Sequence, residues 1–261
     1  MIYEICAQTD QGRVRKNNED AVAFDVPTGL CLLADGMGGY NAGEVASGMA
    51  VGSIKLELGR WLTLAGGQAT ARELRRTIEI CVRNANQSIY KAACGNPDQE
   101  GMGTTLVVGI FLEGRLMLGH IGDSRCYRLR GQALQQITKD HSLLQEQIDA
   151  GLLTPKQALT APNKNLITRA LGVEDSVLIE INEHRVELGD IYLMCSDGLS
   201  DMLRDAPIAV ILGGAGSLLQ KTEQLVAAAN EYGGRDNISV MLVHALEDGA
   251  RRAIVSRMLG K

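Results

Sequence analysis

Aspartates at the ends of short apolar segments have the clearest chemical potential in this sequence. Asp35, Asp123 and Asp197 each follow such a segment and precede a small residue, whereas Asp236 precedes another segment. If these segments are strands in adjacent register, four carboxylates meet at one rim, where they repel each other unless cations neutralise them. The alternative is that each aspartate only forms a turn, because Asp-Gly and Asp-Asn favour hairpin and loop conformations.

The residue types indicate which metal such a rim would hold. The histidines, at 120, 141, 184 and 244, form no two-histidine helix motif and no pair with a cysteine, so a zinc site is poorly supported. Oxygen ligands alone select hard cations, and we expect Mg²⁺ or Mn²⁺ with several waters retained. Two such ions activate a shared water and stabilise an in-line displacement at phosphorus. Hydrolysis of a phosphate ester is therefore the expected reaction.

A mixed-charge segment near the N-terminus, residues 12–20, offers the complementary groups. The guanidinium of Arg15 matches two phosphoryl oxygens, while Glu19 and Asp20 are of the type that orients metal-bound waters. Gly36 lets the backbone approach a metal or phosphate closely and offers a carbonyl. Taken alone, the segment is also typical of a solvated charged loop.

Alternating strands and helices must position these residues. Apolar and β-branched runs predict strands over residues 2–7, 21–25, 30–34, 105–111, 115–121, 125–129, 177–186, 191–195 and 238–243. Apolar residues at three- and four-residue steps predict helices over residues 43–62, 71–93, 142–150 and 218–232. Two long helices therefore separate the third predicted strand from the fourth.

Composition predicts one compact domain. The chain has 261 residues, of which 45% are hydrophobic and 22% charged, and this matches neither a disordered nor a membrane protein. The formal net charge of −5 disfavours binding to a nucleic-acid backbone, and the apolar runs are too short to cross a bilayer. Six scattered cysteines predict free, buried thiols in a reducing cytoplasm, and no secretory signal is visible.

Signatures of other phosphate-handling enzymes do not occur. The sequence has no Gly-x-x-x-x-Gly-Lys-Ser/Thr nucleotide loop, no Gly-x-Gly-x-x-Gly and no Gly-x-Ser-x-Gly nucleophile turn. None of the cysteines is followed six positions later by an arginine, the spacing that a cysteine-dependent phosphatase needs. A covalent thiol mechanism is therefore disfavoured.

Eight ordered motifs carry a family resemblance. They are Gly12-x-x-Arg15-x-x-Asn18-Glu19-Asp20, Ala34-Asp35-Gly36-Met37-Gly38-Gly39, Gly103-Thr104-Thr105-Leu106, Gly119-His120-Ile121-Gly122-Asp123-Ser124-Arg125, Thr138-Lys139-Asp140-His141-Ser142, Ile167-Thr168-Arg169-Ala170-Leu171-Gly172, Ser196-Asp197-Gly198-Leu199 and Gly234-Arg235-Asp236-Asn237-Ile238-Ser239-Val240. With them the sequence resembles the metal-dependent protein serine/threonine phosphatases, the PP2C or PPM family, in its compact bacterial form.

The resemblance implies an α+β fold, a four-layer αββα sandwich. Two central antiparallel sheets would be flanked by helix pairs, with the predicted helices 43–62 and 71–93 as one outer pair and the metals at one end between the sheets. Residues 1–245 would form the catalytic domain, with a partly helical flap over about residues 140–166. Residues 246–261 would form a short C-terminal tail.

The resemblance also implies a role for each site residue. Arg15 would bind the substrate phosphate and Asp35 would bridge two Mn²⁺ or Mg²⁺ ions, which makes these two the catalytic residues. At the metal site, the Gly36 carbonyl would bind the first ion, and Asp197 and Asp236 would bind the second. Glu19 would hold one of the waters of the second ion, and Asp20 would support the cluster. Asp123 with Asp197 would bind a weaker third ion.

Two departures from the family pattern leave the general acid unassigned. Met37 stands where some relatives have a histidine proposed to protonate the leaving alkoxide, and Tyr40 stands where some bacterial relatives have another histidine. We expect His120 and His141 to be hydrogen-bonded structural residues rather than catalytic ones.

The implied function is a protein serine/threonine phosphatase. A water or hydroxide that bridges the two ions would attack phosphorus directly, without a phosphoenzyme. The expected partners are phosphorylated proteins, including a serine/threonine kinase and its targets. We expect the phosphatase itself to be a cytoplasmic monomer. One alternative is a metal-binding regulatory or kinase-recruiting module without turnover. A metal-dependent nuclease is disfavoured by the net charge and by the small number of aromatic residues.

Overall fold

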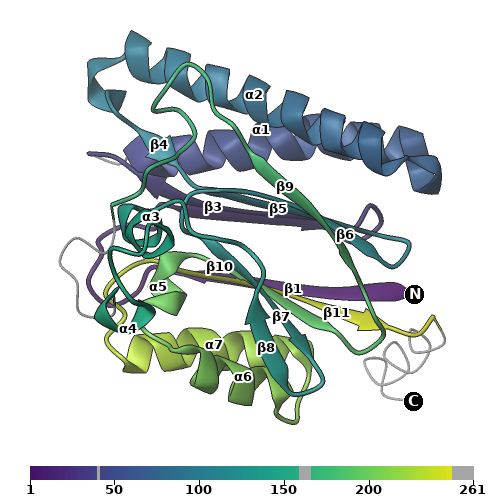
Figure 1. Cartoon of the computed structure of the whole chain (residues 1–261). Coiled ribbons are helices and arrows are strands. Elements are labelled where there is room, and N and C mark those ends of the chain that lie inside the picture. Colours follow the sequence, from purple (N-terminus) through teal and green to yellow (C-terminus); the bar gives the residue numbers. More distant parts are fainter. Residues whose placement is uncertain (40–41, 159–165, 249–261) are drawn as a thin grey trace.

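Two antiparallel β-sheets stack face to face and carry helices on their outer faces (Figure 1). The computed structural model describes residues 1–39, 42–158 and 166–248. The first sheet has the order β1-β11-β10-β7-β8, made of Ile2–Asp10, Ile238–Leu246, Ile191–Cys195, Arg125–Arg130 and Ala133–Gln136. The second has the order β2-β3-β5-β6-β9, made of Asp20–Asp25, Leu30–Met37, Leu106–Leu112, Arg115–Ile121 and Glu180–Arg185, and β4 (Gly103–Thr104) pairs with β3.

The helices form two outer layers. Helices α1 (Ala42–Ala65) and α2 (Ala71–Gly95) cover the second sheet, and α6 (Asp205–Gly213) and α7 (Leu218–Glu231) cover the first. The predicted four-layer αββα sandwich, with its outer helix pair, is therefore confirmed. Shorter helices are α3 (Leu143–Asp149), α4 (Pro155–Ala158) and α5 (Asp197–Ser200), with 3₁₀ turns at Gly66–Gln68 and Pro97–Gln99.

Strand β3 shows why the sheets form the centre of the molecule. Successive side chains of a strand point to opposite faces, so Leu32 packs toward α1 and α2 while Cys31 and Leu33 pack between the sheets. The strand is buried on both faces, which explains its unbroken apolar run. Asp35 lies in this strand rather than after it, because β3 continues three residues beyond the predicted end.

Other elements differ from the prediction in identifiable ways. The strand predicted over residues 177–186 is shorter, as β9, and the strands β4 and β8 and the helices α4, α5 and α6 were not predicted. Helix α3 lies within the predicted segment 142–150, where Ser142 caps its N-terminus by accepting from the Gln145 N–H. Residues 159–165 of the predicted flap and 249–261 of the predicted tail lie outside the described residues.

Two further sequence-based expectations concern the cysteines and the membrane. All six cysteines are free thiols, but Cys94 is exposed and Cys6 only half-buried, so the expectation of buried thiols is wrong for these two. In the described part of the chain, no helix combines the length and the apolar character that a bilayer crossing requires.

Candidate metal centre

Two carboxylates face each other across strands β2 and β3. Asp20 is the register partner of Asp35, so the hairpin itself brings the two residues together. The Asp35 backbone is held on both sides: its N–H donates to Thr105 Oγ1 (3.0 Å), and its carbonyl accepts from the Thr105 N–H (2.9 Å) and from Thr104 Oγ1 (2.8 Å). These bonds fix the position of Asp35 at the end of the sheet.

The other sheet brings a second pair of aspartates to the same place. Asp197 begins α5 directly after β10, and Asp236 precedes β11, the strand paired with β10. Ser196 joins the sheets, because its hydroxyl donates to Asp20 Oδ2 at 2.8 Å. Gly198 has no room for a side chain, since an added Cβ would lie 1.9 Å from the Asn237 carbonyl oxygen. The Ser196 bond therefore joins the two sheets at the carboxylates.

The Asn237 side chain organises the segment that carries Arg15. Its amide oxygen accepts from the Glu19 N–H (2.9 Å), and its amide nitrogen donates to the carbonyls of Gln11 (2.9 Å) and Asn17 (2.8 Å). Arg15 Nη2 then lies 2.7 Å from Asp236 Oδ2. About half of the Arg15 side chain is exposed (49%), so part of the guanidinium remains open to an incoming anion.

The electrostatics of the cluster match the expected repulsion. Removal from water raises the pKa of Asp35 and of Asp197 well above the ordinary range, and their aspartate neighbours raise both pKa values further. Burial also raises the pKa of Asp20 and that of Asp123 to about 6 each. Keeping these carboxylates ionised therefore costs free energy, and a bound cation would lower that cost.

The donor set fits divalent hard cations. Two buried carboxylate oxygens, Asp20 Oδ1 and Asp123 Oδ1, have no hydrogen-bond partner among the described residues, and such orphaned acceptors are rare unless an ion or water completes them. Oxygen ligands favour Mg²⁺ and Mn²⁺. Among the described residues the carboxylates do not form a set of three ligand atoms within 4.8 Å of one another. This spread suits hydrated ions, since Mg²⁺ usually keeps several waters.

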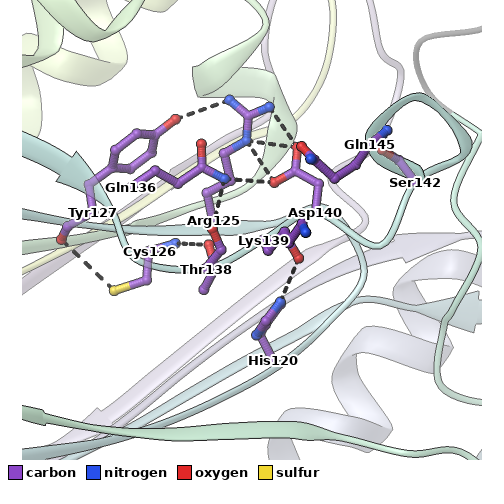
Figure 2. Close-up of polar contacts among 10 residues, drawn as sticks. All are labelled: His120, Arg125, Cys126, Tyr127, Gln136, Thr138, Lys139, Asp140, Ser142 and Gln145. Atoms are coloured by element: carbon purple, nitrogen blue, oxygen red, sulfur yellow. Dashed lines mark hydrogen bonds and ion pairs between the residues drawn. The ribbon is translucent and has the colours of Figure 1, made fainter. Parts of the chain in front are cut away.

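A polar network surrounds Arg125, the first residue of strand β7 (Figure 2). Arg125, two residues after Asp123, donates through Nε and Nη2 to both carboxylate oxygens of Asp140 at 2.7–3.0 Å. Gln136 Nε2 donates to the same carboxylate (2.9 Å), and Arg125 Nη1 donates to the Tyr127 hydroxyl. The network ties the first residue of β7 to the start of the predicted flap.

The two histidines of the motifs lie beside this network as a stacked pair. The rings of His120 and His141 are 4.6 Å apart and nearly parallel. His120 Nε2 lies 2.8 Å from the Lys139 carbonyl oxygen, and His141 Nδ1 accepts from the Gly122 N–H. Burial, followed by the charges of His120 and Arg169, lowers the pKa of His141 to about 4. Both histidines are hydrogen-bonded, as expected, and their structural role stays a prediction.

A scan against protein-family models matches residues 8–243 to the model described as Protein phosphatase 2C. The chain belongs to the protein phosphatase 2C family. Among curated proteins, it is 37% identical to the serine/threonine phosphatase stp of Listeria monocytogenes, over 90% of this chain and 93% of that protein. It is 38% identical to the protein phosphatase PhpP of Streptococcus pneumoniae, over 95% of this chain and 99% of that protein.

Solved structures agree with this membership. The crystal structure of the Mycobacterium tuberculosis serine/threonine phosphatase PstP/Ppp has a TM-score of 0.83 and 37% identity, over 95% of this chain and 100% of that chain. The PstP catalytic domain in complex with two manganese ions has a TM-score of 0.81 and 37% identity, over 94% of this chain and 99% of that chain. The manganese pair in that catalytic domain agrees with the cofactor expected from the sequence, a pair of Mn²⁺ or Mg²⁺ ions.

The structure gathers most of the residues that sequence reasoning selected. Asp236 raises the pKa of Asp20, Asp35 and Asp197, Asp123 raises that of Asp35 and Asp197, and Arg15 contacts Asp236. The Glu19 carbonyl accepts from the Gly36 N–H at 3.1 Å, which places these two residues side by side. Tyr40 lies outside the described residues.

Sequence reasoning missed two contributors to the site. Asp201 raises the pKa of Asp123 and of Asp197, and it follows Asp197 by one helical turn; that spacing was the signal available in the sequence. Asn237 was quoted only within a motif, although it bonds to three backbone groups of the Arg15 segment. Its role depends on a contact between residues more than 200 positions apart, which no local pattern reveals.

In the metal-free protein, the buried Asp123 carboxylate should lower the free energy of unfolding at neutral pH. Because the folded state raises its pKa to about 6, the native protein binds more protons than the unfolded chain between about pH 4 and pH 6, and stability falls as pH rises through this window. In a chelator at pH 7, Asp123→Asn should therefore raise the free energy of unfolding by about 2–3 kcal/mol. Urea unfolding at pH 7 and pH 4 tests this; the gain should vanish at pH 4, and a less stable variant at pH 7 would contradict it.

The Arg125–Asp140 pair should matter for metal use as well as for stability. Asp140→Asn weakens a largely buried, charge-assisted fork and should cost about 2 kcal/mol of unfolding free energy. It should also raise the Mn²⁺ concentration for half-maximal activity by about tenfold, the size seen when a residue that orients metal ligands is lost. Urea unfolding and a Mn²⁺ titration of hydrolysis measure the two effects.

Strand β7 offers a matched control at its other end. Arg130, the last residue of the strand, forms a similar fork with Asp190 through Nε (2.8 Å) and Nη2 (2.7 Å), far from the carboxylates. Asp190→Asn should lower stability comparably but leave the Mn²⁺ requirement unchanged. If both variants shift the Mn²⁺ titration equally, the effect of Asp140 is only a loss of stability.

Proposed function

We propose that this chain hydrolyses phosphoserine and phosphothreonine in phosphorylated proteins as a metal-dependent phosphatase. The observation that carries the proposal is the joining of Asp20 and Asp35 on one sheet with Asp197 and Asp236 on the other, beside Arg15. The serine/threonine phosphatases to which the chain is similar, and the two manganese ions of the PstP catalytic domain, support the same reaction.

The cluster offers a place for each metal ligand that the family resemblance implies. Asp35 and the Gly36 carbonyl would hold the first ion, and Asp35, Asp197 and Asp236 would hold the second. Glu19 would bind through a water, and Asp123 with Asp197 would hold a third ion. Asp20 would support Asp35 from its place across the hairpin. Gly36 can approach an ion because it lacks a side chain; an added Cβ would lie 2.1 Å from the Gly43 carbonyl oxygen.

When bound, the ions supply an activated water and positive charge beside the phosphoryl group. Arg15 binds phosphoryl oxygens through guanidinium donors other than the one that contacts Asp236. Thr104 and Thr105 hold Asp35 in place, so no rearrangement of this strand is needed during the reaction. The Asn237 bonds keep the Arg15 segment in reach of the same point.

The domain limits, partner and setting extend this proposal. Residues 1–245 would form a single catalytic domain with a flap over about 140–166, and 246–261 a short tail. The kinase that phosphorylates the substrates would be a serine/threonine kinase in the same bacterial cytoplasm, and the phosphatase would act as a monomer. The free cysteines support a reducing compartment.

Metal-dependent turnover tests the proposal. With Mn²⁺ or Mg²⁺, the protein should hydrolyse both a small aryl phosphate and a phosphoserine peptide, and a chelator should abolish both activities. An oligonucleotide should remain intact under the same conditions. Tight Mn²⁺ binding without hydrolysis of any phosphoester would instead support the alternative, a regulatory or kinase-recruiting module, against which the complete ligand set argues.

A further inference from the structure

A groove of about 580 Å³ lies beside the candidate metal centre. One wall is Met37, two residues after Asp35 on β3, and the other is formed by residues between Ile167 and Leu178. This segment leads into β9 (Figure 1). Large apolar side chains in it are open to solvent: Val173 is 50% exposed and Leu178 is 84% exposed. Single exposed apolar residues are common, but a group of them in a concave surface indicates a binding site.

The groove is fixed relative to Asp35 by backbone bonds. Leu171 and Thr104 exchange two backbone hydrogen bonds (3.0 and 2.8 Å), and the Thr104 hydroxyl donates to the Asp35 carbonyl. On the other side, the buried Asn86 of α2 accepts from the Gly172 N–H (2.8 Å) and donates to the Glu174 carbonyl (3.0 Å). The walls are therefore held in place before any ligand binds, which lowers the cost of binding.

Val173 joins the groove directly to the strand at the metal centre. An added Cβ on Gly103 of β4 would meet Val173 Cγ2 at 2.8 Å and Met37 Cε at 3.2 Å, so these two side chains pack over the same glycine. Gly103 is the register partner of Met37. The apolar surface thus continues from the β3 strand that carries Asp35 into the groove.

We propose that this groove receives an apolar side chain of the protein substrate, next to the phosphorylated residue. The proposal rests on the proposed function, because a phosphoserine held at Asp35 must bring its neighbouring residues over the adjoining surface. Successive residues of an extended segment lie about 3.3 Å apart along the chain and every second side chain faces the same side, so a residue close to the phosphoserine can enter the groove while the phosphoserine faces Asp35. An apolar side chain buried in the groove would cover the exposed side chains of Val173 and Leu178.

Two labelled phosphoserine peptides test the groove, one with leucines on both sides of the phosphoserine and one with glycines there. We expect the wild type to prefer the leucine peptide by about tenfold in kcat/KM, equivalent to 1.4 kcal/mol. The double variant Val173→Ser, Leu178→Ser should lose this preference. Both residues are exposed, so the changes should leave the fold intact. Leu188→Ser, at another exposed leucine (58%) that precedes β10 and so lies at the opposite end of this strand from Asp197, should keep the preference.

The outcomes separate the groove from the proposed function. An equal preference in wild type and double variant would overturn the groove proposal, while hydrolysis of a small aryl phosphate reports on the metal centre alone. If the wild type does not hydrolyse the aryl phosphate, the proposed function fails, and fluorescence anisotropy with the same two peptides still decides whether the groove binds leucine.

Discussion

Asp35→Asn should lower the rate of Mn²⁺-dependent aryl phosphate hydrolysis by at least about 10²-fold, and Asp236→Asn should do the same. Asp35 has the register partner Asp20, and three other aspartates also raise its pKa, so it lies within reach of the charges of all four carboxylates. The amide keeps the size of the side chain and removes only its charge. Initial rates at saturating Mn²⁺ measure the effect.

Stability measurements distinguish this loss from misfolding. Because removal from water and like charges raise the pKa of Asp35, neutralising it should leave the chelated protein at least as stable as the wild type at pH 7. Asp98→Asn, at an exposed aspartate in the 3₁₀ turn Pro97–Gln99, should retain full activity. Near-normal rates in both the Asp35 and Asp236 variants would show that these carboxylates have no catalytic role.

Arg15→Gln should reduce kcat/KM for phosphoesters by about 10- to 100-fold, the range expected when a charge-assisted bond to a phosphoryl group is lost. Hydrogen bonding to Asp236 raises the pKa of Arg15, so the side chain stays cationic where phosphate would bind. Most of the loss should appear in KM, since Arg15 contacts substrate already in the ground state. Steady-state kinetics with the aryl phosphate separate KM from kcat.

Arg13 provides the matched control for Arg15. It lies two residues earlier in the same exposed segment, and its backbone N–H bonds to the Gly234 carbonyl at 2.7 Å. Arg13→Gln keeps that backbone bond and removes the same charge, so it should leave kcat/KM within about twofold of the wild type. Equal losses in the two variants would mean that the segment acts through its overall charge rather than through Arg15.

Sequence patterns predicted the layers well but not the contacts between them. The unbroken apolar run in β3 and the three- and four-residue steps in α2 reflect burial within single elements, and local sequence records this directly. Strand β8 was missed because only its alternate residues are half-buried, and α5 because it is a single turn. Short elements at the surface carry too few residues to establish a period.

In the candidate site, too, the sequence predicted which residues take part but not the contacts between them. The aspartates of the site were selected by residue type and by the motifs, which need no coordinates. The pairing of Asp20 with Asp35, the Ser196 bridge between the sheets and the Arg125–Asp140 fork depend on strand register and on residues far apart in the chain. Their partners become visible only when the two sheets are stacked.

The most direct test of the metal centre is a crystal soaked in Mn²⁺ and measured for anomalous scattering. The structure predicts peaks between Asp35, Asp197 and Asp236, where the two sheets meet. A rival position exists, because ligand atoms of His120, His141 and Glu180 all lie within 4.8 Å of one another. Manganese bound only at that histidine group, or nowhere near Asp35, would contradict the assignment of the aspartates as the catalytic metal site.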